Sequence, residues 1–158
     1  PVDGGRRSFA CRISGRAGVR MIRLAQKADS EDVYRLICAL EQTALPRKMF
    51  DQLFAAQTER DLALVWDEGG KVTGFVHVRM ELQLHHCARI AEIMELVVAE
   101  EVRGRGIGRA LFECACVRSA QAGCVQIELS CHCARHDAHR FYEREGMMLS
   151  HRRYVMPL

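Results

Sequence analysis

The stretch Glu95-Leu-Val-Val-Ala-Glu-Glu-Val-Arg-Gly-Arg-Gly-Ile-Gly-Arg109 decides the fold, because a strand pattern runs into a glycine-rich turn and then into a helix pattern. The hydrophobic run before the turn predicts a strand over about residues 90–98. A helix is expected from about Gly106 to Ala122, since apolar residues after the turn recur at helical spacing, at Ile107, Leu111, Cys114 and Val117.

The turn between these two elements has the composition of an anion-binding site. Its glycines let the backbone adopt positive φ and approach a ligand closely. The first turn of a helix presents unpaired N–H groups and a partial positive charge, which suit a pyrophosphate. Arg103, Arg105 and Arg109 add fixed positive charge. The spacing fits neither a dinucleotide fingerprint nor a nucleotide P-loop, and a turn that only packs the helix on a sheet is the alternative.

The remaining pattern predicts an α/β (α+β) fold of order β-α-α-β-β-β-α-β-α-β, with helices on both faces of a mixed sheet. The turn Asp67-Glu68-Gly69-Gly70 indicates a β-hairpin. The other expected strands are 21–24, 62–66, 72–82, 125–131 and 148–156, and the other expected helices are Asp29 or Ser30 to Glu41, Pro46 to Thr58, and His136 to Arg144.

Composition and charge fit one globular domain. The chain has 158 residues, of which 49% are hydrophobic and 27% charged, and no apolar run is long enough to cross a bilayer. Residues 1–20 hold five arginines against Asp3, which gives this segment a charge of +4, so the remainder of the chain carries 3 − 4 = −1. That balance disfavours a nucleic-acid partner. We expect a leader, tag or disordered extension over 1–20, with a targeting peptide as an alternative, and a single domain over 21–158.

The eight cysteines do not indicate a disulfide framework. No secretory signal is recognisable, and most cysteines lie within periodic apolar segments, where a thiol packs as a small hydrophobe. A reducing, cytoplasmic location without a membrane partner is the expectation.

The glycine-rich turn resembles the acetyl-CoA signature of the GNAT superfamily of N-acetyltransferases, Arg/Gln-x-x-Gly-x-Gly/Ala, with Arg103, Gly106 and Gly108 at its defined positions. The resemblance covers about residues 21–158. It implies a mostly antiparallel sheet that is splayed at its centre, where acetyl-CoA lies. The residues that it assigns to the coenzyme are Leu96, Val97, Val98, Arg103, Gly104, Arg105, Gly106, Ile107, Gly108, Arg109 and Arg135, the last replacing a common asparagine.

Two residues are candidates for the chemistry of such an enzyme. An ammonium ion must lose a proton before it attacks a thioester, and Glu92 resembles the glutamate that serves several GNAT enzymes as general base. Glu92 and Glu95 are three residues apart, so they point to opposite faces of a regular strand unless a bulge intervenes. The stretch 138–146 resembles the late GNAT motif Ala-x-x-x-Tyr-x-x-x-Gly, which makes Tyr142 the proposed general acid.

The acceptor is suggested by the pair His85-His86 and the stretch 135–142. Together with 91–98 they resemble aminoalkylphosphonate N-acetyltransferases, a bacterial GNAT family. This resemblance implies a small molecule with a primary amine and a phosphonate dianion, which His and Arg side chains or a divalent metal would neutralise. The candidate substrate-binding residues are His85, His86, Glu95 and His136.

Three alternatives stay open. The enzyme could acetylate protein N-termini or lysines, or the chain could be a non-catalytic acyl-CoA-binding sensor. A divalent ion could lie near His85, His86 or Glu92, whereas Cys131-His132-Cys133 lacks the spacing of a usual zinc knuckle, and no metal ligand set is predicted. The resemblance also allows a homodimer, since GNAT domains often pair through sheet edges.

Overall fold

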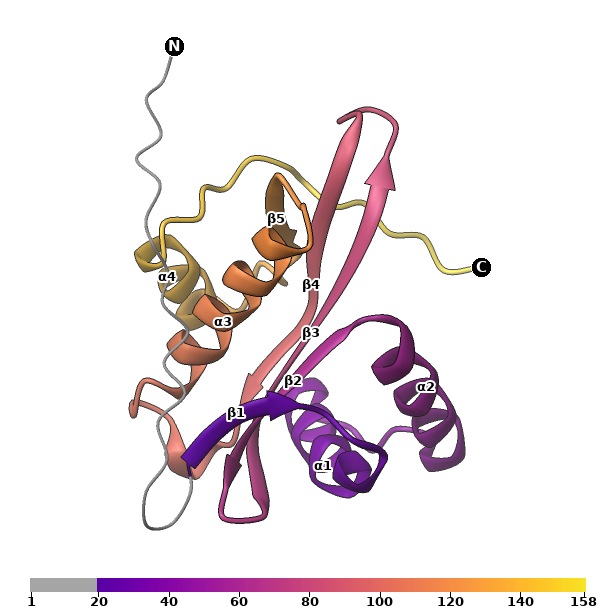
Figure 1. Ribbon diagram of the computed structural model, residues 1–158, viewed down its shortest axis with the longest axis vertical. Coiled ribbons are helices and arrows are strands. Elements are labelled where there is room, and N and C mark those ends of the chain that lie inside the picture. The colour runs from indigo at the N-terminus through magenta and orange to yellow at the C-terminus, as the bar shows by residue number, and fades with distance from the viewer. Residues whose placement is uncertain (1–19) are drawn as a thin grey trace. The chain divides into compact units, whose positions relative to one another are not determined.

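The computed structural model describes residues 20–158 (Figure 1). These residues divide into two compact units, of which the first ends at Glu128 and the second is Leu129–Leu158, and each is described by itself. The expected leader, residues 1–20, lies outside the described residues except for Arg20, which is the first residue of a strand. No helix in the described part of the chain has the length and hydrophobicity needed to span a bilayer.

A five-stranded sheet organises the fold, and its strands lie side by side in the order of the sequence. The first three pairings are antiparallel. Gly69 and Gly70 both have positive φ, as the predicted hairpin turn requires. The strands are β1 (Arg20–Leu24), β2 (Leu62–Glu68), β3 (Lys71–Gln83), β4 (Ala88–Val98) and β5 (Gln126–Leu129).

The helices agree with the predicted ones to within about two residues. In Figure 1, α1 and α2 lie on one side of the sheet and α3 on the other, which confirms the mixed architecture with helices on both faces. The helices are α1 (Ser30–Glu41), α2 (Arg47–Arg60), α3 (Ile107–Gln121) and α4 (His136–Arg144), with short 3-10 turns at Lys27–Asp29 and Glu100–Val102.

Each face of the sheet has its own packing. Val33 and Leu36 of α1 and Phe54 of α2 are buried against a cluster of apolar strand residues that includes Phe75. On the other face α3 approaches β3 at Gly74, where an added Cβ would lie 2.9 Å from Leu111 Cδ1. This close approach fixes the start of α3 against the sheet, so the glycine-rich turn before it has a defined position.

The expected strand over 148–156 is wrong, and the strand expected over 125–131 is shorter than predicted. Residues 147–158 belong to no helix or strand, and Leu149, Tyr154 and Val155 are largely exposed. An alternating apolar pattern permits a strand, but a strand forms only where another one supplies ladder hydrogen bonds. The sequence pattern could not show whether such a partner exists.

The cysteines behave as expected where the structure describes them. Cys38, Cys87, Cys124, Cys131 and Cys133 are free thiols, and Cys114 is buried in α3. The core of the first unit is therefore built from apolar packing.

Candidate active site

A β-bulge in β4 sets the geometry of the candidate site. His77 of β3 pairs with Glu95, and the next residue, Val78, pairs with Ile93, so Met94 is an extra residue without a partner on β3. Such an insertion shifts the alternation of side chains by one position.

The bulge places both glutamates on one face of the sheet. Glu95 lies opposite His77 and Glu92 lies opposite Arg79, and these two β3 residues are two positions apart, so their side chains share a face. The face is the one on which α1 and α2 pack, because Phe75 continues the same alternation. The sequence alone left open whether a bulge separates Glu92 from Glu95, and the structure has this bulge.

Glu92 is held by a cation. Arg79 Nη2 donates a hydrogen bond of 2.7 Å to Glu92 Oε2, and Arg79 Nε lies 2.5 Å from Glu81 Oε1. The Glu92 side chain is 22% exposed, and that of Arg79 is 39% exposed. Glu92 is therefore paired with a partly accessible guanidinium, a group that also binds anions.

Glu95 belongs to a buried network that sequence reasoning missed. His77 is only 3% exposed. Its Nδ1 lies 2.8 Å from Glu95 Oε2 and its Nε2 lies 3.0 Å from Asp61 Oδ2. Arg60 also donates two hydrogen bonds to Asp61, at the point where α2 gives way to β2. Asp61, His77 and Glu95 form a continuous hydrogen-bonded row, which we call the His77 triad.

The charge state of the His77 triad follows from its contacts. Burial disfavours the imidazolium, but the hydrogen bonds to Glu95 and Asp61 outweigh it and raise the pKa of His77 above 6.5. Burial acts against the Asp61 carboxylate too, yet Arg60 and His77 lower the pKa of Asp61 below 3.8. Both ring nitrogens of His77 lie within hydrogen-bond distance of carboxylate oxygens, and the protonated ring is the form that can donate to both.

The glycine-rich turn has the conformation that the sequence predicts. Gly104 and Gly106 have φ of +76° and +80°, and Gly106 is the residue immediately before α3. An added Cβ at either glycine would meet nothing within 4 Å, so the outer side of the turn is open. A glycine N-cap supplies no side-chain acceptor, so it leaves the first N–H groups of α3 uncapped.

The arginines of the turn brace its surroundings. Arg103 Nε donates to the carbonyl of Val98, at the end of β4, and Arg105 Nη2 contacts Glu68 Oε1 at 3.3 Å. Arg109 Nε donates to Glu113 one helical turn on. Leu96–Val98 pair with β3 and lead to the short 3-10 turn Glu100–Val102, after which the glycine-rich turn begins.

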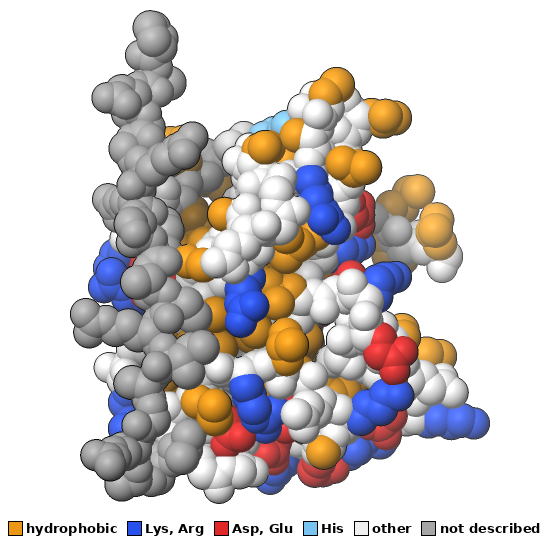
Figure 2. Space-filling model, viewed as in Figure 1, with side chains coloured by type: hydrophobic (Ala, Val, Ile, Leu, Met, Phe, Trp, Pro, Cys, Tyr) orange, Lys and Arg blue, Asp and Glu red, His pale blue; other side chains and the backbone are white. Residues whose placement is uncertain are grey.

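His85 and His86 lie apart from the two glutamates. They occupy the exposed tip of the β3–β4 hairpin, with ring centroids 4.3 Å apart. Strand geometry puts the tip about 15 Å along β4 from Glu92. Figure 2 shows hydrophobic side chains at this protruding end, to which the exposed Leu82 and Leu84 belong. The structure thus does not bring His85 and His86 together with Glu92 and Glu95.

Three candidates lie in the second unit, Leu129–Leu158. Tyr142 is on α4, Arg135 immediately precedes this helix, and His136 is its first residue. Burial is the main cause, and the nearby Cys131 a smaller one, of the rise in the pKa of Tyr142 to about 12. Arg135 acts in the opposite direction. The hydroxyl of Tyr142 is therefore protonated at neutral pH.

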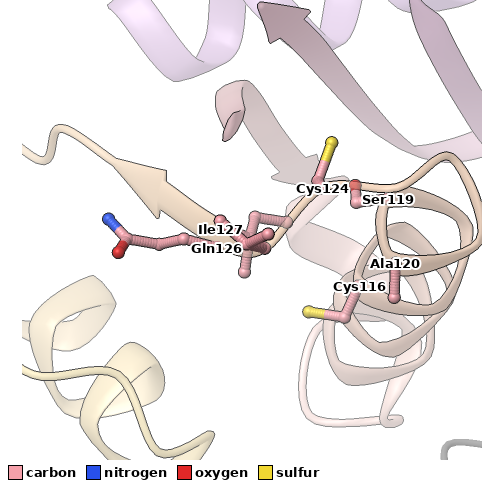
Figure 3. A pocket seen from close by; sticks show the side chains of 7 residues that line it. Cys116, Ser119, Ala120, Cys124, Gln126 and Ile127 are labelled. Atoms are coloured by element: carbon pink, nitrogen blue, oxygen red, sulfur yellow. The ribbon is translucent and has the colours of Figure 1, made fainter. Parts of the chain in front are cut away.

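The metal-ligating side chains and a cavity between residues 20 and 158 bear on what else the site could hold. No group of three or more His, Cys, Asp or Glu side chains there is arranged to hold a metal ion. A shallow cavity of about 160 Å³ lies between the end of α3 and the start of β5 (Figure 3). Its lining includes Cys116, Ser119 and Ile127 and no charged residue, so it does not match a charged acceptor.

Residues 30–147 match the acetyltransferase (GNAT) family. The chain belongs to this family. It is also 40% identical to the aminoalkylphosphonate N-acetyltransferase of Salmonella typhimurium, over 87% of this chain and 90% of that protein. The protein is therefore an acyltransferase, and its family uses acetyl-CoA as the donor.

Solved structures agree on the fold of this GNAT chain. A transcriptional regulator from Bacillus halodurans has a TM-score of 0.80 at 24% identity, covering 88% of this chain and 99% of that one. Glucosamine-6-phosphate N-acetyltransferase from Arabidopsis thaliana has a TM-score of 0.72 at 21% identity, covering 88% and 98%. At these identities the likeness concerns the fold alone.

The His77 triad predicts how the free energy of unfolding depends on pH. Because folding raises the pKa of His77, the contribution of this residue is complete below its unfolded pKa of 6.5 and is lost as pH rises through the higher folded value. Folding lowers the pKa of Asp61, so the contribution of Asp61 to the free energy of unfolding is present at neutral pH and is lost as the pH falls into the acid range. Urea unfolding of the wild type and of His77→Phe between about pH 6 and pH 9 measures the difference.

We expect the stability difference between the two proteins to shrink as pH rises. A difference that stays constant over this range would show that His77 does not gain charge stabilisation from its two carboxylates. The comparison with His77→Phe removes the contributions of titrating groups that do not contact His77, and the Asp61 contribution changes only in acid, below the pH range compared.

Proposed function

We propose that the protein transfers an acetyl group from acetyl-CoA to the primary amine of an aminoalkylphosphonate. The observation that carries this proposal is the surface formed by Glu92, Glu95 and Arg79 on one face of the sheet. Carboxylates match an ammonium group, and a guanidinium matches a phosphonate in fork geometry. The name of the Salmonella relative supports the same acceptor class.

In this proposal the glycine-rich turn binds the coenzyme. The uncapped N–H groups at the start of α3 would hold the pyrophosphate, with Arg103, Arg105 and Arg109 adding positive charge. The backbone of Leu96–Val98 would hold the pantetheine arm beside β4. The positive φ of Gly104 and Gly106 and the open space beyond them support this assignment.

Replacing Gly106 with valine should abolish CoA binding, because a β-branched side chain would stand in the open space at the helix start and would be strained at a φ of +80°. Isothermal calorimetry with CoA measures the affinity. Gly123→Val is the matched control, since Gly123 has a φ of +84° and nothing within 4 Å, but lies at the other end of α3. Equal affinities in both variants and the wild type would refute the donor-site assignment.

Glu92 is the proposed general base, and its ion pair with Arg79 is the obstacle to that role. The hydrogen bond from Arg79 Nη2 occupies Glu92 Oε2. A phosphonate dianion would compete with Glu92 for Arg79, and once Arg79 turns to the phosphonate this oxygen of Glu92 is released. The acceptor would thereby free the carboxylate oxygen that takes its proton, directly or through water.

Tyr142 is the proposed general acid, which protonates the thiolate of CoA as the C–S bond breaks. Its pKa of about 12 supports the role, because the hydroxyl keeps its proton until a stronger base forms beside it. Arg135 and His136, at the start of the same helix, stay candidates for coenzyme and acceptor contacts. His85 and His86 stay candidates for the phosphonate only if the acceptor reaches the hairpin tip.

Tyr142→Phe should lower kcat about 10²-fold or more, in the range of general acid catalysis, while CoA affinity changes little. The substitution removes the proton donor and keeps the ring that packs within the second unit. Steady-state kinetics and CoA calorimetry on the same preparation separate the two effects. If kcat were unchanged, water or another group would supply the proton.

A panel of amines with acetyl-CoA tests the proposed function. The panel compares 2-aminoethylphosphonate and aminomethylphosphonate with 2-aminoethanesulfonate, polyamines, and peptides with free N-termini or lysines. We expect the highest kcat/KM with the phosphonates, since the sulfonate offers one negative charge where the phosphonate offers two. Parallel runs with EDTA and with added divalent metal test whether a metal assists.

Two other results of the amine panel would indicate a different function for the protein. Preference for peptides would indicate a protein N-terminal or lysine acetyltransferase and would overturn the phosphonate proposal. CoA binding without transfer to any amine would indicate an acyl-CoA sensor.

A further inference from the structure

We propose that His77 and Asp61 are positioning residues that orient Glu95 as the anchor for the ammonium group of the acceptor. The proposal rests on the proposed function insofar as it requires an amine acceptor, but it does not require a phosphonate. Neither His77 nor Asp61 is marked by any motif of the sequence, and both are buried at the edge of the acceptor face.

The geometry of the His77 triad leaves one carboxylate oxygen for a ligand. His77 binds Oε2 of Glu95 at 2.8 Å, and within the described part of the chain Oε1 has no hydrogen-bond or ion-pair partner. The Glu95 side chain is 35% exposed, whereas those of His77 and Asp61 are 4% and 6% exposed. The triad therefore runs from a buried end at Asp61 to an accessible end at Glu95.

Asp61 and His77, at the buried end of the triad, fix the orientation of the Glu95 carboxylate at the accessible end. The terminal torsion of a glutamate is soft, so an isolated surface carboxylate samples many orientations. A hydrogen bond from an imidazole whose other nitrogen is tied to Asp61 removes that freedom. Arg60, on the far side of Asp61, compensates part of the negative charge and keeps Asp61 ionised.

The accessible end of the triad matches an ammonium ion. Glu95 offers a carboxylate oxygen, which accepts a hydrogen bond from an ammonium N–H. His77 occupies the other oxygen of Glu95, so an ammonium group that binds here meets the oxygen that His77 leaves open. Glu92 has a different partner, the side chain of Arg79, which is 39% exposed.

Two amide variants of His77 separate the halves of the triad. The side-chain N–H of asparagine overlays Nδ1 of histidine, so His77→Asn keeps the hydrogen bond to Glu95 and loses the one to Asp61. The longer glutamine overlays Nε2, so His77→Gln keeps the hydrogen bond to Asp61 and loses the one to Glu95. Both variants are neutral and polar, and they differ in which carboxylate they hold.

We expect both His77→Gln and Glu95→Gln to raise the KM for the acceptor about tenfold or more, with a smaller change in kcat. His77→Asn should keep a KM close to that of the wild type. The kinetics use saturating acetyl-CoA and the best acceptor of the amine panel. Phe75→Leu, two residues earlier on the same face of β3, is the control for lost stability and should leave the KM unchanged.

The proposal is overturned if the two amide variants raise the acceptor KM equally, or if neither raises it. It is also overturned if the KM of each variant simply follows its thermal unfolding temperature, as Phe75→Leu would reveal. A panel that favours another amine over the phosphonates refutes the proposed acceptor but leaves this comparison intact. The ring nitrogen resonances of His77, followed by NMR while the amine is titrated, should shift even in a protein with slow turnover, and unchanged resonances would count against the anchor.

Discussion

The extra residue at Met94 is the constraint on which the acceptor face depends. In a regular strand Glu92 and Glu95 would point to opposite faces, one toward α3 and the other toward α1 and α2. The bulge brings them to the same face, opposite Arg79 and His77 respectively. Met94 also lies four residues before Val98, the last residue of β4, after which the chain leads into the glycine-rich turn.

Burying the polar groups of the His77 triad opposes folding through desolvation, and this bears on what the triad does. Removing an imidazolium and a carboxylate from water is offset only when every polar atom finds a partner, and apolar side chains would often stabilise such a site equally well. Here both nitrogens of His77 are paired, and Asp61 receives Arg60 as well. The network is fully paired inside and ends at a partly accessible carboxylate, the position at which we propose that an ammonium ligand binds.

The sequence predicted local features well and long-range ones poorly. The turn at Arg103–Arg109 and the start of α3 were predictable because glycine spacing and helical periodicity depend on residues that are close together in the sequence. The bulge could only be stated as a condition, since register depends on the partner strand. His77 was missed because it lies inside an apolar strand and its partners are 16 and 18 residues away. The strand expected over 148–156 was wrong because its pattern says nothing about an available edge.

The pairing of Arg79 with Glu92 has a consequence for selectivity. If the anion of the acceptor must take over Arg79 before Glu92 can accept a proton, an amine without that anion can bind at Glu95 and still react slowly. Binding energy from the anionic end is then used in the chemical step, so discrimination appears in kcat as well as in KM. A surface that only bound the phosphonate tightly would discriminate through KM alone. In this proposal the two carboxylates have different tasks because they have different partners: the buried His77 beside Glu95, and the partly exposed Arg79 beside Glu92.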